Sequence, residues 1–218
     1  MFLQSVDQEN ISNIRKEYRK AELNKAVAGK DPVAFFEKWF KDVINSGIEE
    51  PNAMMLSTVS SSGKPSSRTV LLKGLIDGRF IFYTNYKSRK GKELESNPDV
   101  ALLIYWMELE RQVRVEGTAR KLDPKRSDSS FKSRPAISQV SAIISPQSEV
   151  VPNRGHLEKI RDDYLSKNKE NYKRPEFWGG YEITPDYIEF WQGRRGRLHD
   201  RIAFSREGEG WKSFRLAP

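Results

Sequence analysis

Residues 53–73, AMMLSTVSSSGKPSSRTVLLK, decide the fold class of this chain. Ala53–Ser60 and Ser66–Lys73 are strand-like runs in which the residue pattern has a period of two. Ser61-Ser62-Gly63-Lys64 lies between them and is typical of a hairpin turn. Because successive side chains of a strand point to opposite faces, this pattern predicts a β-hairpin and not a helix. We therefore expect an antiparallel sheet from residue 53 onward.

Strand-like runs continue through the rest of the chain, with a few helical segments between them. The further expected strands are Phe80–Thr84, Val100–Trp106, Gln112–Leu122, Tyr187–Trp191, Arg197–Ser205 and Trp211–Leu216. The expected helices are one that begins at Pro32 after an Asp31 N-cap, and the segments Ser88–Ser96, Pro124–Lys132 and Arg154–Asn168. Strands do not alternate regularly with helices, which disfavours a parallel doubly wound sheet. The pattern predicts a mainly β protein with helices (α+β), built as a barrel or a sandwich.

Length and composition favour one main domain. The chain has 218 residues, of which 37% are hydrophobic and 11% aromatic, too much apolar material for a disordered protein. No internal repeat or Gly/Ser linker interrupts it. Residues 1–30 are predicted to form a polar N-terminal arm with a helix at Asn10–Leu23, interpreted as a mobile lid. Residues 31–218 are predicted to form a single domain.

The residue types present exclude several kinds of chemistry. The sequence has no cysteine, which excludes disulfides, thiol nucleophiles and cysteine-based zinc sites. With only two histidines, His156 and His199, we do not expect a metal site. The longest apolar run, Val100–Met107, is far shorter than the roughly 18 residues that span a bilayer, and the N-terminus does not resemble a signal peptide. We expect a cytoplasmic protein.

The chain carries 38 Lys and Arg against 30 Asp and Glu, a formal net charge of +8. Such a surplus suits nucleic acid, an acidic membrane surface or phosphorylated small molecules. The alternative is a solvated surface that happens to be basic. The sequence contains no dinucleotide-binding glycine motif, no Walker A loop and no His-Glu-x-x-His motif. The positions of the cations along the chain therefore have to distinguish a ligand site from a solvated basic surface.

Two basic clusters lie in the first half of the chain. Arg68 and Lys73 end up on opposite faces of an apolar strand, which indicates either a ligand site or an edge strand protected by charge. Ser88 is expected to cap a helix whose first turn carries Arg89, Lys90 and Lys92. The helix dipole disfavours cations there, and free N–H groups at a helix N-terminus bind phosphate. We interpret this second cluster as a phosphate site, with a solvated basic helix as the alternative.

Two further clusters lie in the second half. Pro135 is expected to end a helix and to leave Ser133, Arg134 and Ser138 around a loop, where an Arg and hydroxyls suit a phosphate. In Trp191–Arg201, a glycine turn is followed by Arg197, His199 and Arg201, which are predicted to share one face of a strand. Three such groups repel one another unless an anionic or electron-rich ligand is shared.

In this order and at this spacing, the motifs of the chain resemble those of the pyridoxine/pyridoxamine 5′-phosphate oxidase family. The resemblance runs over nearly the whole chain. The matching motifs are Arg68–Lys73, Tyr83–Asn85, Ser88–Lys90, Glu110–Gly117, Ser133–Pro135, Gln147-Ser148, Phe177–Gly180, Glu189–Gly193, Arg197–Arg201 and Arg215–Pro218. It implies a split β-barrel that binds FMN, forms a homodimer and holds two active sites at the subunit interface. It also implies oxidation of pyridoxine or pyridoxamine 5′-phosphate to pyridoxal 5′-phosphate, with O₂ reduced to H₂O₂.

The resemblance also implies roles for individual residues. The residues implied for FMN are Arg68, Thr69, Val70, Leu71, Leu72, Lys73, Tyr83, Thr84, Arg89, Lys90, Gln112, Gln147, Ser148, Trp191 and Arg201. Those implied for the substrate are Lys73, Arg134, Ser138, Arg197, Leu198 and His199, together with Arg15, Lys16, Glu17 and Tyr18 of an N-terminal segment that closes over the site. Arg197 and His199 would be the catalytic residues. The difficult electronics would belong to the cofactor.

One position departs from the family pattern. The family usually has Tyr-Phe before the x-Ser-Arg-Pro motif, and here the pair is Ser130-Phe131. Serine is shorter, so a contact from this position to the substrate phosphate is lost or bridged by water.

Two other functions stay open at this stage. The first is a flavin-binding split-barrel protein with another redox substrate, or a carrier of a vitamin B6 phosphate. The second is a basic barrel that binds nucleic acid, which predicts a colourless protein with steeply salt-dependent binding to oligonucleotides.

Overall fold

The computed structural model describes residues 16–168 and 172–218. Its strands are β1 (Ala53–Val59), β2 (Pro65–Leu71), β3 (Gly74–Ile76), β4 (Arg79–Asn85), β5 (Asp99–Trp106), β6 (Arg111–Lys121), β7 (Trp178–Gln192), β8 (Asp200–Glu207) and β9 (Gly210–Leu216). They form one sheet in the order β2-β1-β5-β6-β7-β4-β3, with β8 paired to β7 and β9 to β8. Every strand pair in the described residues is antiparallel, which confirms the predicted sheet type.

Helices precede or connect these strands. They are α2 (Lys25–Ala28), α3 (Pro32–Asn45), α4 (Arg89–Ser96), α5 (Pro124–Lys132), α6 (Ala136–Ile144) and α7 (Arg154–Lys167), with short 3₁₀ turns η1 (Met107–Leu109) and η2 (Arg195–Arg197). The start of α3 confirms the predicted cap: the Asp31 carboxylate accepts from the Val33 amide at 2.9 Å, and Pro32 occupies the first turn.

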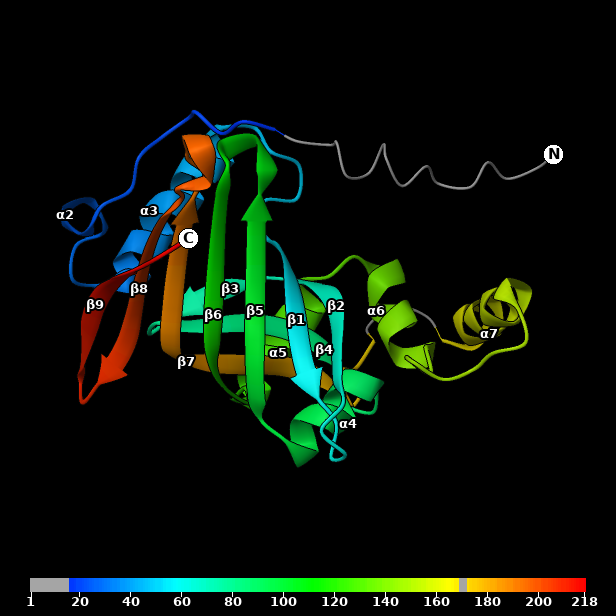
Figure 1. The fold of residues 1–218 in the computed structure, drawn as a ribbon. Coiled ribbons are helices and arrows are strands. Elements are labelled where there is room, and N and C mark those ends of the chain that lie inside the picture. Colours follow the sequence, from blue (N-terminus) through cyan, green and yellow to red (C-terminus); the bar gives the residue numbers. More distant parts are fainter. Residues whose placement is uncertain (1–15, 169–171) are drawn as a thin grey trace.

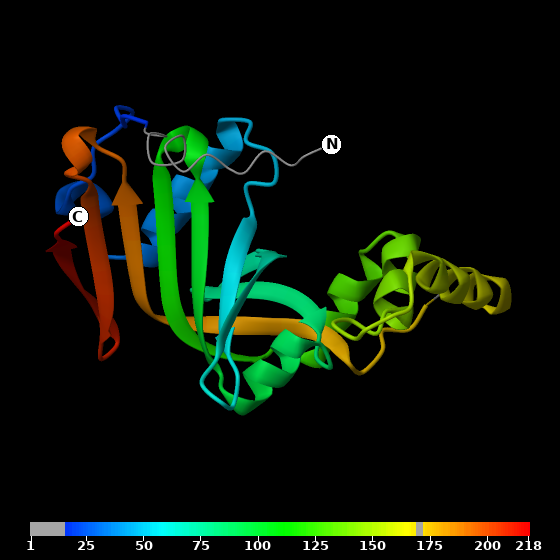
Figure 2. The ribbon, with the colours of Figure 1, turned by 45° about the vertical axis from the view of Figure 1, so that its right-hand side comes forward.

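Strand β7 curls the sheet into a half-barrel. Its first half pairs with β4 and its second half with β8, while β6 runs alongside both halves. The register of β6 against β7 shifts at Glu116/Gly117, opposite Pro185. A Cβ atom on Gly117 would lie 2.2 Å from the Thr184 carbonyl oxygen, so only glycine permits this close approach. Figures 1 and 2 show β7 turning sharply at this point, which gives the mixed α+β half-barrel.

The core lies between α3 and the curved sheet. Phe36 packs edge-on against Phe80 of β4 with 5.0 Å between ring centroids, and Phe35 packs against Phe190 of β7 at 4.7 Å. Trp39 also contacts Phe190, at 5.3 Å. These side chains recur at helical spacing along α3 and are all buried, as the sequence predicted.

Three secondary-structure predictions were wrong or incomplete. The helix predicted at Asn10–Leu23 is absent over residues 16–23, because amides of this stretch donate to side-chain carboxylates instead of to preceding carbonyl groups; residues 10–15 lie outside the described part. The loop expected around Ser138 is helix α6, which begins directly after Pro135. The strand predicted as Tyr187–Trp191 begins at Trp178, since Gly179, Gly180 and Pro185 weaken the sequence signal of β7.

Candidate active site

The N-terminus of α4 carries the first group of functional side chains. Ser88 caps the helix as predicted, with its hydroxyl accepting from the Gly91 amide at 3.3 Å. Arg89 and Lys90 follow in the first turn, Arg89 exposed and Lys90 buried. A Cβ on Gly91 would lie 2.1 Å from the Tyr86 carbonyl oxygen, so the helix packs directly on the preceding loop. The cap and the glycine together place both cations.

Glu93 joins this helix to the β1–β2 hairpin. Its carboxylate receives Arg89 Nε at 2.8 Å and Arg68 Nη2 at 3.1 Å, and the hydroxyls of Thr58 and Ser66 at 2.5 and 2.8 Å. Burial alone would raise the pKa of Glu93, but these hydrogen bonds outweigh it and lower the pKa to about 2. Two predicted site arginines, from different elements, are therefore held by one buried carboxylate.

Lys90, next to Arg89 in α4, is buried where Arg89 is exposed. Its ammonium is within 3.1 Å of Thr84 Oγ1 and 3.2 Å of Gln147 Oε1, and Thr84 also donates to Gln147 at 3.2 Å. Burial, and to a lesser extent the charge of Arg68, lower the pKa of Lys90 to about 8. Four residues implied for FMN are thus neighbours: Arg68, Lys90, Thr84 and Gln147.

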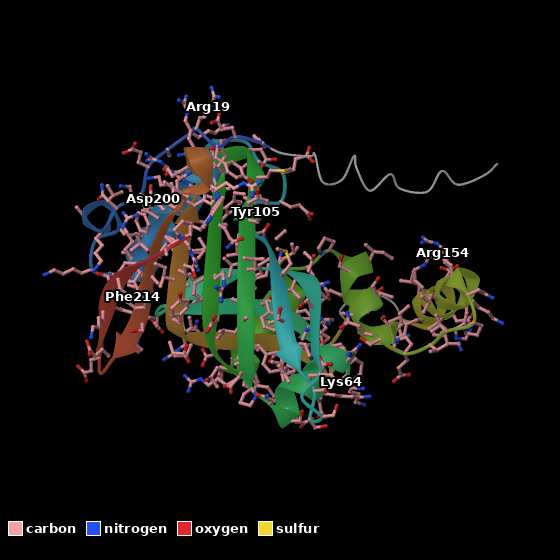
Figure 3. The ribbon with its side chains drawn as sticks, in the orientation of Figure 1. Arg19, Lys64, Tyr105, Arg154, Asp200 and Phe214 are labelled. Carbon is pink, nitrogen blue, oxygen red and sulfur yellow. The ribbon has the colours of Figure 1, made fainter. Side chains whose placement is uncertain are left out.

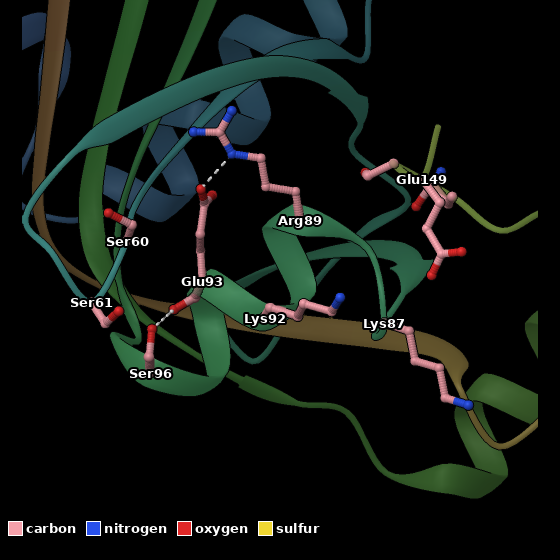
Figure 4. A pocket seen from close by; sticks show the side chains of 10 residues that line it. Ser60, Ser61, Lys87, Arg89, Lys92, Glu93, Ser96 and Glu149 are labelled. Carbon is pink, nitrogen blue, oxygen red and sulfur yellow. Dashed lines mark hydrogen bonds and ion pairs between the residues drawn. The ribbon is translucent and has the colours of Figure 1, made fainter. Parts of the chain in front are cut away.

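An open cavity of about 390 Å³ adjoins these cations. Arg89, Gln147 and Ser148 line it, together with Lys87 and Lys92. Figure 4 shows the Arg89 side chain reaching Glu93 across the rim, with Lys92 further along α4. Glu93 and Glu149 also line it, and Glu93 is already paired with Arg89. The cations therefore outnumber the acids, which suits a phosphate group.

A second cavity, of about 280 Å³, lies on the other side of Gln147 and contains Arg134. The Arg134 guanidinium lies over the Trp178 ring, 5.1 Å from its centroid, and Tyr83 stacks on the same Trp at 5.4 Å. Burial lowers the pKa of Arg134, and its Nε atom is buried without a hydrogen-bond partner among the described residues. Such a donor needs an acceptor from a ligand or water.

The remaining residues predicted around these cavities are spread along β2 and the later helices. Lys73 follows the end of β2 and lines a separate apolar cavity of about 650 Å³ beside α3. Leu72 is buried, Val70 and Leu71 are half-buried, and Thr69 is exposed. Ser138 is on α6 and Ser130 on α5, and neither lines the cavity that contains Arg134.

The second group of functional side chains crosses the far part of the sheet. Gln112, Trp191 and Arg201 are direct cross-strand neighbours on β6, β7 and β8, so their side chains share one face. Arg201 forms a two-point ion pair with buried Glu189, at 2.7 and 3.0 Å, whose hydrogen bonds raise the pKa of Arg201. Glu189 therefore orients the Arg201 side chain beside Trp191.

His199 lies over this face. Its ring centroid is 4.8 Å from that of Trp191, and its Nδ1 accepts from the Arg194 amide at 3.1 Å. Burial, and then the charge of Arg197, lower the pKa of His199, which favours the neutral imidazole. Because Nδ1 accepts, the proton of the neutral ring is on Nε2, which is left able to donate to a ligand.

The predicted placement of Arg197 and His199 on one strand face was wrong. β8 begins only at Asp200, and Arg197 lies in η2 with a φ of 61°, directly after Gly196 with a φ of 64°. Two consecutive left-handed residues turn the chain and cannot continue a strand. Arg197 and Leu198 are consequently exposed at a turn, and His199 contacts Trp191 from the position directly before β8.

The N-terminal segment completes the second group. Tyr18 contacts both Trp191 and His199 edge-on, with ring centroids 5.5 and 5.6 Å away. Lys16 and Glu17 are exposed, and Arg15 lies outside the described residues.

The two groups do not meet within one chain. In the described residues, no hydrogen bond, ion pair or cavity includes members of both. Figures 1 and 2 place α4 and the orange η2 turn at opposite ends of the sheet. A ligand that contacts both groups must therefore bind between two copies of the chain, unless the chain changes its conformation.

Sequence reasoning missed the acidic partners of the site. Glu93 and Glu189 hold predicted site arginines, yet only basic clusters were considered. The spacing of Arg89 and Glu93, one helical turn apart, was an available signal for the first. Nothing in the sequence places Glu189 beside Arg201, because that contact is made across strands.

No group of three or more His, Cys, Asp or Glu residues that could hold a metal ion occurs among the described residues. None of the helices in the same part of the chain is long and apolar enough to cross a membrane.

The curled antiparallel sheet of this chain is a split barrel. The chain has a TM-score of 0.85 to the crystal structure of PhzG from Burkholderia lata 383 in complex with tetrahydrophenazine-1-carboxylic acid, at 29% identity over 90% of this chain and 98% of that one. It has a TM-score of 0.70 to a pyridoxamine 5′-phosphate oxidase-related, FMN-binding protein from Nostoc punctiforme, at 15% identity over 87% and 100% of the two chains. These similarities confirm the predicted fold.

Within that class, the chain belongs to the pyridoxine/pyridoxamine 5′-phosphate oxidase family. The pyridoxamine 5′-phosphate oxidase family model matches residues 40–161, and the model of the pyridoxine 5′-phosphate oxidase C-terminal dimerisation region matches residues 178–218. A pyridoxine/pyridoxamine 5′-phosphate oxidase of Leptospira interrogans is 50% identical over 95% of this chain and 98% of its own length. One from Rubrobacter xylanophilus is 50% identical over 96% and 97%.

Proposed function

We propose that this protein oxidises pyridoxine 5′-phosphate and pyridoxamine 5′-phosphate to pyridoxal 5′-phosphate, with bound FMN and with O₂ as the electron acceptor. The alcohol loses two electrons and two protons, and O₂ is reduced to H₂O₂. For the amine, water is also consumed and ammonia released. The observation that carries this proposal is the convergence of Arg68, Arg89 and Lys90 on the start of α4, in a chain about half identical to named oxidases.

The donor set at α4 fits the phosphate of FMN. Three cationic side chains, the Thr84 hydroxyl and the helix start are polar groups that a dianion would satisfy, and Gln147 lies among them. When bound, FMN supplies the two-electron acceptor that this chain's own side chains lack. Trp191, Arg201 and Gln112 would contact it from the other group.

Arg134 and the second group would hold the substrate. The unpartnered Arg134 Nε suits the substrate phosphate. Ser138 and Lys73 do not line the cavity that contains Arg134, so their proposed contacts with the phosphate rest on the family resemblance alone. Arg197 would orient the pyridine ring, and His199 would donate from Nε2 while Arg194 holds its Nδ1. The role of these residues is to bind, orient and exclude water.

The separation of the two groups supports a homodimer with FMN at the subunit interface. The region similar to family dimerisation sequences, residues 178–218, contains Trp191, His199 and Arg201. Each site would then take its phosphate-binding group from one subunit and its aromatic group from the other. A cytoplasmic location stays a prediction from the sequence.

The direct test is the absorption spectrum of the purified protein, followed by addition of pyridoxine 5′-phosphate without oxygen. We expect flavin absorption that bleaches on addition, and H₂O₂ release once air is admitted. A flavoprotein that does not bleach would indicate the alternative, a split-barrel protein with another substrate, as the complex held by PhzG illustrates. A colourless protein that FMN cannot reconstitute would contradict the proposal and favour the nucleic-acid alternative.

Arg197→Leu tests the substrate site separately. We expect kcat/KM for pyridoxine 5′-phosphate to fall by about 100-fold or more, since the guanidinium that orients the pyridine ring is lost, while the protein stays yellow. Near-normal turnover in this variant would remove Arg197 from the site.

A further inference from the structure

The segment from Lys16 to Asn24 crosses the end of the sheet as a non-helical strap. It passes beside η2 and the β5–β6 turn, where Figure 3 labels Arg19. At its far end it is fixed to the domain: Leu23 is buried, its amide donates to Asp200 Oδ2 at 3.0 Å, and its carbonyl accepts from Arg215 at 3.0 Å. Its near end, which carries Tyr18, needs an anchor of its own.

Glu110 is that anchor. It is 2% exposed and sits in the turn between β5 and β6 with a left-handed φ of 55°. Its Oε2 accepts from the Arg19 amide at 2.8 Å and from the Lys20 amide at 3.0 Å, and Lys16 Nζ lies 4.0 Å from its Oε1. A buried carboxylate that receives two backbone amides is held strongly, because both hydrogen bonds are charge-assisted.

The same residue also fixes the strand end beneath the strap. The Glu110 carbonyl oxygen accepts from the Gly193 amide at 2.8 Å and from Gln192 Nε2 at 3.1 Å. Gly193 leaves the space that Tyr18 occupies, since a Cβ there would lie 2.6 Å from Tyr18 Cγ. One residue thereby sets the distance between the strap and the end of β7.

Tyr18 is the side chain that this arrangement places. Tyr18 directly precedes Arg19, whose amide Glu110 binds. Its ring lies against Trp191 and His199. It also forms a hydrogen bond that raises the pKa of Tyr105 to about 12. Glu110 itself is buried, and among the described residues no hydrogen bond joins its carboxylate to these rings.

We propose that Glu110 is a positioning residue, which acts through the strap amides to hold Tyr18 as one wall of the substrate site. This inference rests on the proposed function for its kinetic consequence, but not for the anchoring itself. Loss of the carboxylate charge should free residues 16–20 while Leu23 stays docked. Substrate binding should then weaken, and FMN binding should not.

The experiment compares Glu110→Gln with wild type in the full-length holoenzyme. Trypsin should cleave after Arg19 and Lys20 about tenfold faster in the variant, because hydrogen bonds to a charged acceptor are lost from the strap. The KM for pyridoxine 5′-phosphate should rise about fivefold or more, with kcat and the FMN dissociation constant nearly unchanged. Glu108→Gln is the matched control, since Glu108 is exposed in the same turn. It should match wild type in every readout.

A double-mutant cycle with Tyr18→Ala separates positioning from a general structural role. If Glu110 acts through Tyr18, Glu110→Gln adds nothing to the KM of the Tyr18→Ala variant. Tyr18→Ala alone should leave trypsin cleavage slow, because the amides stay anchored. Additive KM effects, or unchanged cleavage in Glu110→Gln, would overturn the proposal.

Two further measurements apply if the Glu110→Gln variant does not fold or if the wild-type protein is inactive. If Glu110→Gln does not fold, Arg19→Pro removes one donated amide without touching Glu110 and leaves the Lys20–Ala21 bond for trypsin. Cleavage after Lys20 should then be faster than in wild type, and unchanged cleavage there counts against the anchor. If wild type does not oxidise the substrate, the proposed function fails while the cleavage comparison still decides the anchor.

Discussion

At the scale of single residues, Glu93 and Lys90 are buried on the same helix and are perturbed by different forces. Hydrogen bonds from Thr58, Ser66, Arg89 and Arg68 outweigh burial and lower the pKa of Glu93 to about 2. For Lys90, burial dominates and lowers the pKa to about 8. The two residues therefore give the protein two separate pH dependences, one in stability and one in cofactor binding.

Glu93 makes stability depend on acid pH. Because its folded pKa lies below its ordinary value of 4.5, its stabilising contribution is complete above that value and is lost as the pH falls toward 2. Between pH 6 and 3.5, wild type should lose about 1 kcal/mol of unfolding free energy more than Glu93→Gln. Urea denaturation at both pH values measures this. Equal losses in the two proteins would contradict the assigned pKa.

Lys90 makes FMN binding depend on alkaline pH. The protonated form attracts the phosphate, and above its pKa of about 8 that charge is progressively lost. We expect the FMN dissociation constant of the apoprotein to rise about tenfold from pH 7 to pH 9, since each unit above the pKa removes a further tenfold of the cation. Quenching of FMN fluorescence on binding measures it. Lys90→Arg should bind with little change over this range, and a flat wild-type profile would exclude Lys90 from the phosphate site.

At the scale of elements, α4 and the β1–β2 hairpin could be predicted from the sequence, but their contact could not. The Ser88 cap and the turn at residues 61–64 are local signals, and both are confirmed. Glu93 and Arg68 are 25 positions apart, and they come into contact only because α4 packs back onto the hairpin. Strand β7 was predicted at a third of its length because its glycines serve close packing.

Gly91 tests how closely α4 must pack. In Gly91→Ala the new Cβ meets the Tyr86 carbonyl, which is backbone and cannot move aside, so α4 must shift. We expect unfolding free energy to fall by about 2 kcal/mol and FMN affinity to fall by about tenfold or more. Glu95→Ala, on the exposed side of the same helix, should change stability by less than about 0.5 kcal/mol. Thermal denaturation and FMN titration check both; a wild-type Gly91→Ala protein would contradict the packing argument.

At the scale of the whole molecule, the two functional groups lie at opposite ends of the sheet, which supports the proposed dimer with residues of two chains in each site. One group gathers Arg68, Arg89 and Lys90 around α4, and the other presents Trp191, His199 and Arg201. In a symmetric dimer the same interface builds both sites. A variant in one group would then impair the part of a site that one subunit supplies, and a variant in the other group would impair the part that the partner supplies.

Mixing two inactive variants tests this arrangement. If Arg89→Ala and Arg197→Leu are co-refolded, half of the dimers are mixed, and each mixed dimer has one intact site. Activity should therefore recover to about a quarter of wild type. The control mixes Arg89→Ala with Lys90→Ala, which lie in the same group and should not restore activity. Equal, negligible activity in both mixtures would place both groups in one subunit's site.

The sequence by itself determined the antiparallel sheet, the capped helices and the basic motifs, because strand period, N-caps and charge clusters are local properties of neighbouring residues. Only the tertiary structure decided which acids hold the site arginines, that Arg197 leaves the strand at a left-handed turn, and that residues 16–23 form an anchored strap instead of a helix. Those outcomes depend on contacts between residues far apart in the chain, such as Arg19 and Glu110, 91 positions apart, and Leu23 and Asp200, 177 positions apart, and no local pattern encodes them.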